Sequence, residues 1–323
     1  MDAVGMSVAR AGHGERNGVL RLPLRVLADY LTLTKPPIIS LLLVTAIGGM
    51  FLASRHAGGS GIPDLWTLLL VCAGGALGAG GANAINHYMD HDIDSLMART
   101  ASRPVPGLRV RPLAALAYGI ALNIAAFAVL AYWVNLLAAG LTLAATLFYV
   151  LVYTGWLKRS TPQNIVIGGA AGSIPPVVGW VAVTGSFDLP ALYLFAIVFF
   201  WTPPHFWALS LLIQRDYERA GVPMLPVVAG EERTVGSIFV YSLVLVALTL
   251  VFVATGAVGL VYLAAALALG AVFIWAAWRL RRLPPLNQPR RPRARNLYLY
   301  SLLYLALLFG AMMADGVYRY PLS

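Results

Sequence analysis

The sequence has 323 residues, of which 59% are hydrophobic and only 11% are charged, and it carries a net charge of +10. A soluble domain has about a quarter charged residues, so this composition excludes an ordinary soluble globular protein. Long apolar runs recur along the chain, and they are continuous instead of alternating with polar residues as barrel strands do. Because backbone polar groups must be satisfied within lipid, we expect an all-α, polytopic membrane helical bundle with a central cavity capped by cytoplasmic loops.

Residues 1–30 mix acidic and basic side chains and contain no apolar stretch of the signal-peptide kind. We interpret them as a flexible cytosolic lead-in to a membrane domain over residues 31–323. The hydropathy pattern predicts nine membrane-spanning helices in that domain, at residues 37–54, 65–88, 112–132, 136–154, 163–183, 190–213, 234–255, 257–279 and 297–316. Two longer connections, 89–111 and 214–233, follow the second and sixth spans.

The basic residues are distributed unevenly between the two sides of the predicted bundle. An odd number of spans places the termini on opposite sides, and of the 23 Lys and Arg residues only Arg55 and Arg319 fall on the side away from the N-terminus. The positive-inside rule therefore predicts a cytoplasmic N-terminus and an outside C-terminus in the cell inner (plasma) membrane. Topology accounts for the positive charge, so the lipid bilayer is the expected partner and no nucleic acid is expected.

The end of the second span carries the segment NHYMDHDID, in which Asn86, Asp90 and Asp94 are spaced four residues apart. On a helix these side chains form one column with steps of about 6 Å. Two carboxylates and an amide oxygen are hard ligands of the kind that Mg²⁺ prefers, together with water and substrate phosphate. A column of this kind at a membrane boundary predicts a site for a lipid diphosphate, with the headgroup on the metal and the chain inside the bundle.

Other polar residues on the same predicted side complete this candidate site. Arginine forks match diphosphate oxygens, and Arg99 and Arg103 follow the acidic column closely, while Lys158 and Arg159 lie at the mouth of the fourth span. Asp216, after the sixth span, provides an acidic group from the opposite loop.

The sixth predicted span contains His205 directly after a predicted helix break at Pro203 and Pro204. An ionisable residue at that depth is a functional candidate by default. Glycine-rich stretches such as GGALGAGGAN, in contrast, predict close helix packing and not a nucleotide site.

Three blocks of the sequence resemble the UbiA-type intramembrane prenyltransferases, and within them the protoheme farnesyltransferase branch. The blocks are NAINHYMDHDIDSLMARTASRP, YTGWLKRSTPQNIVIGGAAGSIPPVVGW and FWTPPHFWALSLLIQRDYERAGVPMLPVV, and the similarity covers residues 30–315. The resemblance implies Mg²⁺-dependent transfer of a farnesyl group from farnesyl diphosphate to a vinyl group of protoheme IX (heme B). The product would be heme O for heme-copper oxidase biogenesis, with heme A synthase as a downstream partner.

The resemblance also assigns roles by position. Asn86, Asp90 and Asp94 match the family's metal–diphosphate motif and Asp216 its second acidic loop, so all four are expected to be catalytic metal ligands. The family's basic residues around the phosphates are matched by Arg99, Arg103, Lys158 and Arg159. Since the resemblance implies a flat, iron-containing acceptor, we expect His205 to contact the heme. One departure is that the second loop reads QRDYERAG, whereas relatives with aromatic acceptors have a fuller D-x-x-x-D.

Three alternatives remain open at this stage. The acceptor of the same chemistry can be another aromatic compound, although the TPPHFW block suits a flat porphyrin. A secondary transporter would place ionisable groups near the midplane, whereas here the acidic residues gather at one face. A heme-binding oxidase assembly protein such as heme A synthase needs several intramembrane histidines, and only His205 is counted here.

Overall fold

The computed structural model describes residues 13–282 and 290–318, and within them the regular structure is all helical, with no strand. In these residues nine helical segments are long and apolar enough to cross a membrane, as predicted. Six of them are single helices: α2 (Pro36–His56), α3 (Leu65–Met89), α5 (Pro112–Trp133), α10 (Leu189–Leu212), α13 (Leu260–Arg281) and α14 (Arg291–Tyr318). The other three combine consecutive elements: α6 (Leu136–Leu147) with η1 (Phe148–Leu157) and α7 (Lys158–Ser160); α8 (Asn164–Gly172) with α9 (Ile174–Thr184); and α12 (Leu225–Val251) with η2 (Phe252–Thr255). The all-α membrane bundle is confirmed, and its central cavity stays a prediction.

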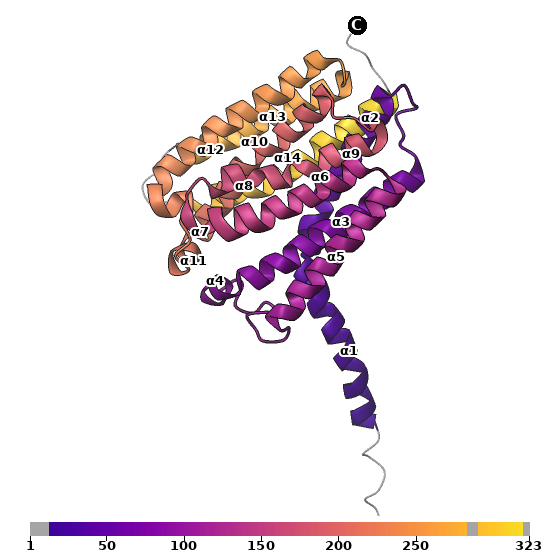
Figure 1. Cartoon of the computed structure of the whole chain (residues 1–323). Coiled ribbons are helices and arrows are strands. Elements are labelled where there is room, and N and C mark those ends of the chain that lie inside the picture. Colours follow the sequence, from indigo (N-terminus) through magenta and orange to yellow (C-terminus); the bar gives the residue numbers. More distant parts are fainter. Residues whose placement is uncertain (1–12, 283–289, 319–323) are drawn as a thin grey trace, which may run out of the picture.

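The helix α1 (His13–Thr34) precedes the bundle and extends away from it (Figure 1). It includes much of the predicted lead-in, while residues 1–12 lie outside the described residues. The flexibility of the lead-in and its boundary at residue 30 therefore stay predictions.

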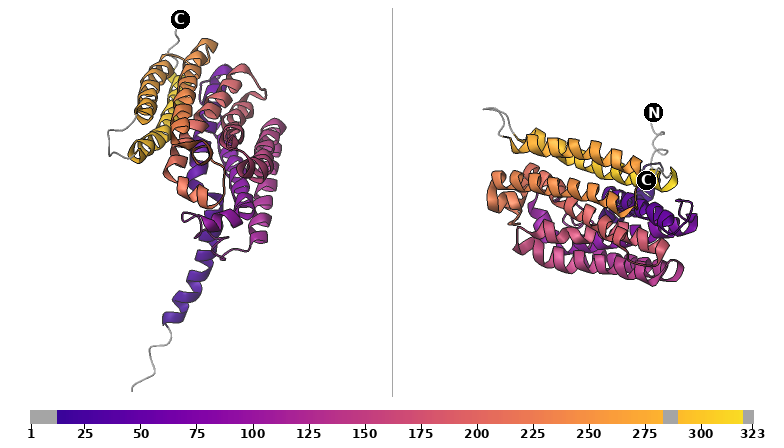
Figure 2. Two further views of the ribbon diagram at one scale, coloured as in Figure 1. Left: turned by 90° about the vertical axis from the view of Figure 1, so that its left-hand side faces the viewer. Right: turned by 90° about the horizontal axis from the view of Figure 1, so that it is seen from above.

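The spans pack as two groups that share a central seam (Figure 2). In one group, α3 packs on α5, α5 on α6, and α6 on α9, and α2 closes the group by packing along α9. In the other, α10 packs on α12, α12 on α13, and α13 on α14. At the seam α14 contacts α2, and α10 contacts α8 and α9. Consecutive spans also contact one another, so neighbours in sequence are neighbours in space.

Glycines let the helices of the first group approach closely. A Cβ added to Gly49 of α2 would lie 2.3 Å from the carbonyl oxygen of Pro176, and one added to Gly179 of α9 would lie 2.0 Å from that of Ala46. The predicted packing role of the glycine-rich stretch in α3 is confirmed in the same way, because a Cβ on Gly81 would lie 2.6 Å from the Gly119 oxygen in α5. Small residues are how membrane helices bring their backbones together.

The helices differ from the predicted ones in several places. The fourth span continues to Ser160, six residues beyond its predicted end, and α14 begins at Arg291, six residues before its predicted start. The predicted connection 214–233 is partly helical, with α11 (Gln214–Arg219) followed by an early start of α12 at Leu225. Gly230, with φ 77° and ψ 170°, forms a kink that joins this first turn to the rest of α12. The predicted break at Pro203 and Pro204 is wrong, because α10 continues through both prolines to Leu212.

Candidate functional site

The column of oxygen ligands predicted from the sequence is present where α3 ends and the short helix α4 (His91–Leu96) begins. The Asp90 amide donates to the Asn86 carbonyl oxygen at 2.9 Å, and the Asp94 amide donates to the Asp90 carbonyl oxygen at 2.8 Å. Helical hydrogen bonding thus continues through the junction, and this keeps the three side chains on one face. All three are at most 3% exposed, so the column is not a solvated helix end.

Each carboxylate of the column is paired with a cation from another segment. Lys158 Nζ donates to Asp90 Oδ2 at 2.5 Å, and Arg103 Nη1 donates to Asp94 Oδ2 at 2.6 Å. The Arg159 guanidinium lies 3.8 Å from Asp90 Oδ1 and makes two hydrogen bonds to Asp92, at 2.7 and 2.8 Å. These bonds hold the pKa of Asp92 down at about 2. The predicted residues Arg103, Lys158 and Arg159 therefore do gather at the column.

A fourth cation reaches the column from the residue that precedes the first span. Lys35 Nζ donates to Asn86 Oδ1 at 2.9 Å, although 51 residues separate the two. The Lys35 backbone lies in the left-handed region, with φ 55° and ψ 63°, which costs a residue with a Cβ about 1–2 kcal/mol. Burial, followed by the charges of Arg103 and Lys158, lowers the pKa of Lys35 to about 7. A bound anion would favour its charged form.

Several buried polar atoms, at the column and in α8, which packs on η1, have no hydrogen-bond partner among the described residues. They are Asp90 Oδ1, both ring nitrogens of His87, and both amide atoms of Asn164. His87 is 1% exposed and Asn164 is fully buried. A buried polar group without a partner costs about 1–3 kcal/mol, so atoms of this kind commonly await a ligand.

The donor set fits a magnesium ion bound together with a phosphate ligand. Asn86, Asp90 and Asp94 offer the hard oxygens that Mg²⁺ prefers, and the unpartnered Asp90 Oδ1 is available for coordination. In the described part of the chain, no group of three or more His, Cys, Asp or Glu side chains is arranged to hold a metal ion. The remaining ligands must then come from water and substrate, as is usual for Mg²⁺.

The second connection meets the first through Tyr217 of α11, which is 5% exposed. Burial raises the pKa of Tyr217 to about 12, and the charges of Arg99, Arg103, Asp216 and Asp94 also act on its hydroxyl. Two loops that are distant in sequence therefore converge, as Figure 1 also shows for α4 and α11. Asp216 is half-buried and Arg99 exposed, and neither makes a hydrogen bond to the column, so their roles stay predictions.

His205 lies at the seam between α10 and α14. Its Nδ1 is 2.7 Å from Ser301 Oγ, and its ring stacks between Trp201 and Tyr298, with centroid distances of 4.3 and 5.0 Å. These contacts account for a buried histidine by helix packing, and a heme contact stays a prediction. His205 is also not the only histidine within a span, because His87 lies inside α3.

Three residues at or beside the column carry no strong signal in the sequence. Lys35 stands among other basic residues before the first span, and His87 lies inside the acidic motif. Thr154, which accepts a hydrogen bond from Asn86 Nδ2 at 3.1 Å, belongs to the π-helical segment η1. Local widening of a helix into a π-helix often marks a functional position, but its register is not readable from sequence.

Comparisons with known proteins agree with this geometry. A family model described as the UbiA prenyltransferase family matches residues 42–308. A protoheme IX farnesyltransferase from Chloroflexus aurantiacus is 52% identical over 293 residues, which cover 90% of this chain and 48% of that protein, so this chain spans about half of its length. A protoheme IX farnesyltransferase from Gloeobacter violaceus is 51% identical over 294 residues, which cover 91% of this chain and 93% of that protein.

Similarity also extends to solved structures. A UbiA homolog from Archaeoglobus fulgidus bound to GPP and Mg²⁺ superimposes with a TM-score of 0.59. The match covers 88% of this chain and 99% of that chain, at 18% sequence identity. At this level of identity the likeness concerns the fold.

Proposed function

The chain belongs to the UbiA prenyltransferase family, and from this premise we propose that it transfers a farnesyl group from farnesyl diphosphate to a vinyl group of protoheme IX. The proposal is supported by the Gloeobacter violaceus relative, which is 51% identical over 93% of its own length. Family membership favours a prenyltransferase over the transporter alternative. The single observation that carries the chemistry is the buried column of Asn86, Asp90 and Asp94 surrounded by three cations.

The charges of this cluster suit a metal-bound diphosphate. Lys35, Lys158 and Arg103 can bring three positive charges, while Asp90 and Asp94 bring two negative ones. The cluster is therefore complementary to an anion. When bound at Asn86, Asp90 and Asp94, Mg²⁺ would stabilise the negative charge of the diphosphate leaving group.

The cations have a defined task in this reaction. As the bond between the first farnesyl carbon and the diphosphate oxygen breaks, negative charge develops on the leaving group. Lys158 and Arg103 are held in place by Asp90 and Asp94, so they need little reorganisation to receive that charge. The vinyl carbon of protoheme then attacks the allylic cation, and water supplies the hydroxyl group of the product.

The bundle itself protects the reactive cation. Thr154 and Asn164 are fully buried, and Tyr217 of the second connection is also buried and close enough for the charge of Asp94 to act on its hydroxyl. Exclusion of water slows the competing hydrolysis of the allylic cation. His205 is kept as a proposed contact of the heme substrate, and Arg99 and Asp216 as proposed contacts of the diphosphate.

The helices and the basic residues together indicate where the protein lies in the cell. Nine apolar helices in the described part of the chain make it a multi-pass membrane protein. We propose the cell inner membrane, with the column at the cytoplasmic face, because nearly all basic residues lie at that end. Heme A synthase is the proposed recipient of the product.

The test is direct. Purified protein is incubated with heme, Mg²⁺ and farnesyl diphosphate, and the pigment is weighed by mass spectrometry. A mass increase of one farnesyl group plus one hydroxyl group supports the proposal. Farnesylation of a hydroxybenzoate or naphthoate, in which the farnesyl group replaces a ring hydrogen and no hydroxyl is added, with heme unchanged, would replace it with the other aromatic acceptors.

A further inference from the structure

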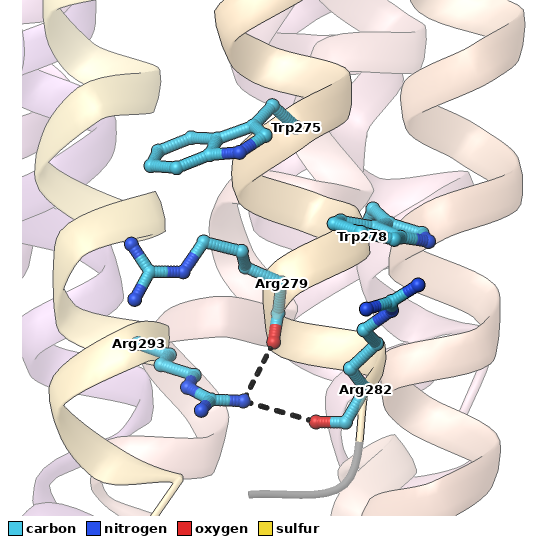
Figure 3. Close-up of a pocket in the computed structure, with 5 residues that line it drawn as sticks. All are labelled: Trp275, Trp278, Arg279, Arg282 and Arg293. Carbon is cyan, nitrogen blue, oxygen red and sulfur yellow. Dashed lines mark hydrogen bonds between the residues drawn. The ribbon is translucent and has the colours of Figure 1, made fainter.

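A second polar site lies away from the column, between the end of α13 and the first turns of α14. It is a pocket of about 320 Å³ lined by Trp275, Trp278, Arg279, Arg282 and Arg293 (Figure 3). α13 ends and α14 begins at the same end of the bundle at which α3 ends and α4 begins. The pocket therefore lies near the same membrane boundary as the column, on the other group of helices.

The arginines of the pocket are held by backbone and aromatic groups. Arg293 Nη1 donates to the carbonyl oxygens of Arg279 and Arg282, at 2.9 and 3.1 Å. The Arg279 guanidinium lies 4.9 Å from the ring centroid of Trp275, and that of Arg282 lies 3.7 Å from the ring centroid of Trp278. The two stacked pairs lie next to each other in Figure 3. These contacts fix the positions of the guanidinium groups without neutralising them.

The pocket has an excess of positive charge that its surroundings do not balance. No carboxylate lies within 4 Å of any of its three arginines, among the residues that the structure describes. Arg290, close by in sequence, does pair with Glu231 and Glu232. Arginine near the end of α13 is favourable to that helix, but α14 begins RPRAR with no acid in its first turn, where positive charge is unfavourable. An anion in the pocket would balance the excess positive charge and offset the unfavourable charge at the start of α14.

The two tryptophans indicate which kind of anion this pocket binds. Trp275 is 52% and Trp278 37% exposed on the outside of the bundle, and amphipathic rings of this kind concentrate at the level of lipid headgroups. Arginine forks match phosphate oxygens, and basic pockets between transmembrane helices at this boundary bind anionic headgroups. We propose that this pocket binds the phosphate of an anionic glycerophospholipid, with the glycerol and upper acyl region against Trp275 and Trp278.

The test uses the full-length protein in nanodiscs or mild detergent. Phosphatidylglycerol, phosphatidylcholine and inorganic phosphate are the probes, and binding is followed by native mass spectrometry and by quenching of tryptophan fluorescence with a bromine-labelled lipid. For the unmodified protein we expect retention of phosphatidylglycerol over phosphatidylcholine. Equal retention of both lipids, or binding of inorganic phosphate that fully displaces the lipid at millimolar concentration, would overturn the lipid assignment.

A pair of double variants locates the binding. Arg279→Gln with Arg282→Gln should weaken phosphatidylglycerol binding roughly 30-fold, because each arginine near an anionic headgroup contributes roughly fivefold to affinity. The control is Arg281→Gln with Arg295→Gln, which removes the same charge from the same end of the bundle. Arg281 stacks on Phe239, outside the pocket. Equal weakening in both double variants would reduce the effect to general surface charge and overturn the pocket.

Discussion

The pairing of Lys158 with Asp90 leads to a prediction that separates stability from catalysis. The two groups are 2.5 Å apart, and their side chains are 12% and 1% exposed. At an effective dielectric constant of 20 their attraction is about 6–7 kcal/mol, most of which is offset by the loss of hydration. Removal of one partner leaves the other charge buried and uncompensated, which typically costs about 3–5 kcal/mol.

We therefore expect Lys158→Met alone to lower the free energy of unfolding by about 3 kcal/mol. The value lies at the low end because the Arg159 guanidinium, at 3.8 Å, and Asn86 Nδ2, at 2.6 Å, still contact Asp90. Adding Asp90→Asn should recover most of that loss, since no buried charge of this pair remains. Asp90→Asn alone leaves Lys158 uncompensated and should also cost about 3 kcal/mol, so the coupling energy of the double-mutant cycle should be about 4–5 kcal/mol.

Activity should behave differently from stability in the same variants. Farnesyl transfer to heme should be lost in both single variants and should stay lost in the double variant, because the carboxylate and the cation are both missing from the diphosphate site. Unfolding is measured in mixed micelles by circular dichroism, and turnover by mass spectrometry. A double variant that turns over like the unmodified protein would refute the catalytic role, and a coupling energy near zero would refute the buried pair.

Three further outcomes follow from the geometry. Asp94→Asn should lower kcat by about 10²–10³-fold and leave the helical spectrum unchanged. A Mg²⁺ titration should show weaker binding of the metal, and a normal kcat would remove Asp94 from the site. Gly179→Ala should lower the free energy of unfolding by about 1–3 kcal/mol, because its Cβ would lie 2.0 Å from the Ala46 oxygen. The control Gly140→Ala has open space around its Cβ and should be neutral or slightly stabilising. Similar unfolding curves for both variants would contradict the close approach of α2 and α9. His205→Ala should shift the heme absorption spectrum and leave farnesyl diphosphate affinity nearly intact; an unchanged spectrum with lowered stability would assign His205 to packing alone.

Local patterns in the sequence were enough for the membrane spans and for the column. Each span is a continuous apolar stretch, and its hydrogen bonds close within the segment, so composition alone locates it. The spacing of Asn86, Asp90 and Asp94 fixes one helix face because successive i→i+4 bonds continue through the junction of α3 and α4. The predicted spans match the helices except at three ends, where charged residues interrupt the hydropathy. The fourth span continues to Ser160, α14 begins at Arg291, and α12 begins at Leu225 with a kink at Gly230.

Only the tertiary structure decided which cations meet the column. Lys35 is 51 residues from Asn86 and Lys158 is 68 residues from Asp90, and no local period relates residues that far apart. The continuity of α10 through Pro203 and Pro204 was equally unreadable, because proline frees carbonyl groups that only a neighbouring helix or a side chain can satisfy. His205 bonds to Ser301, 96 residues away, since packing of α10 on α14 brings the two together.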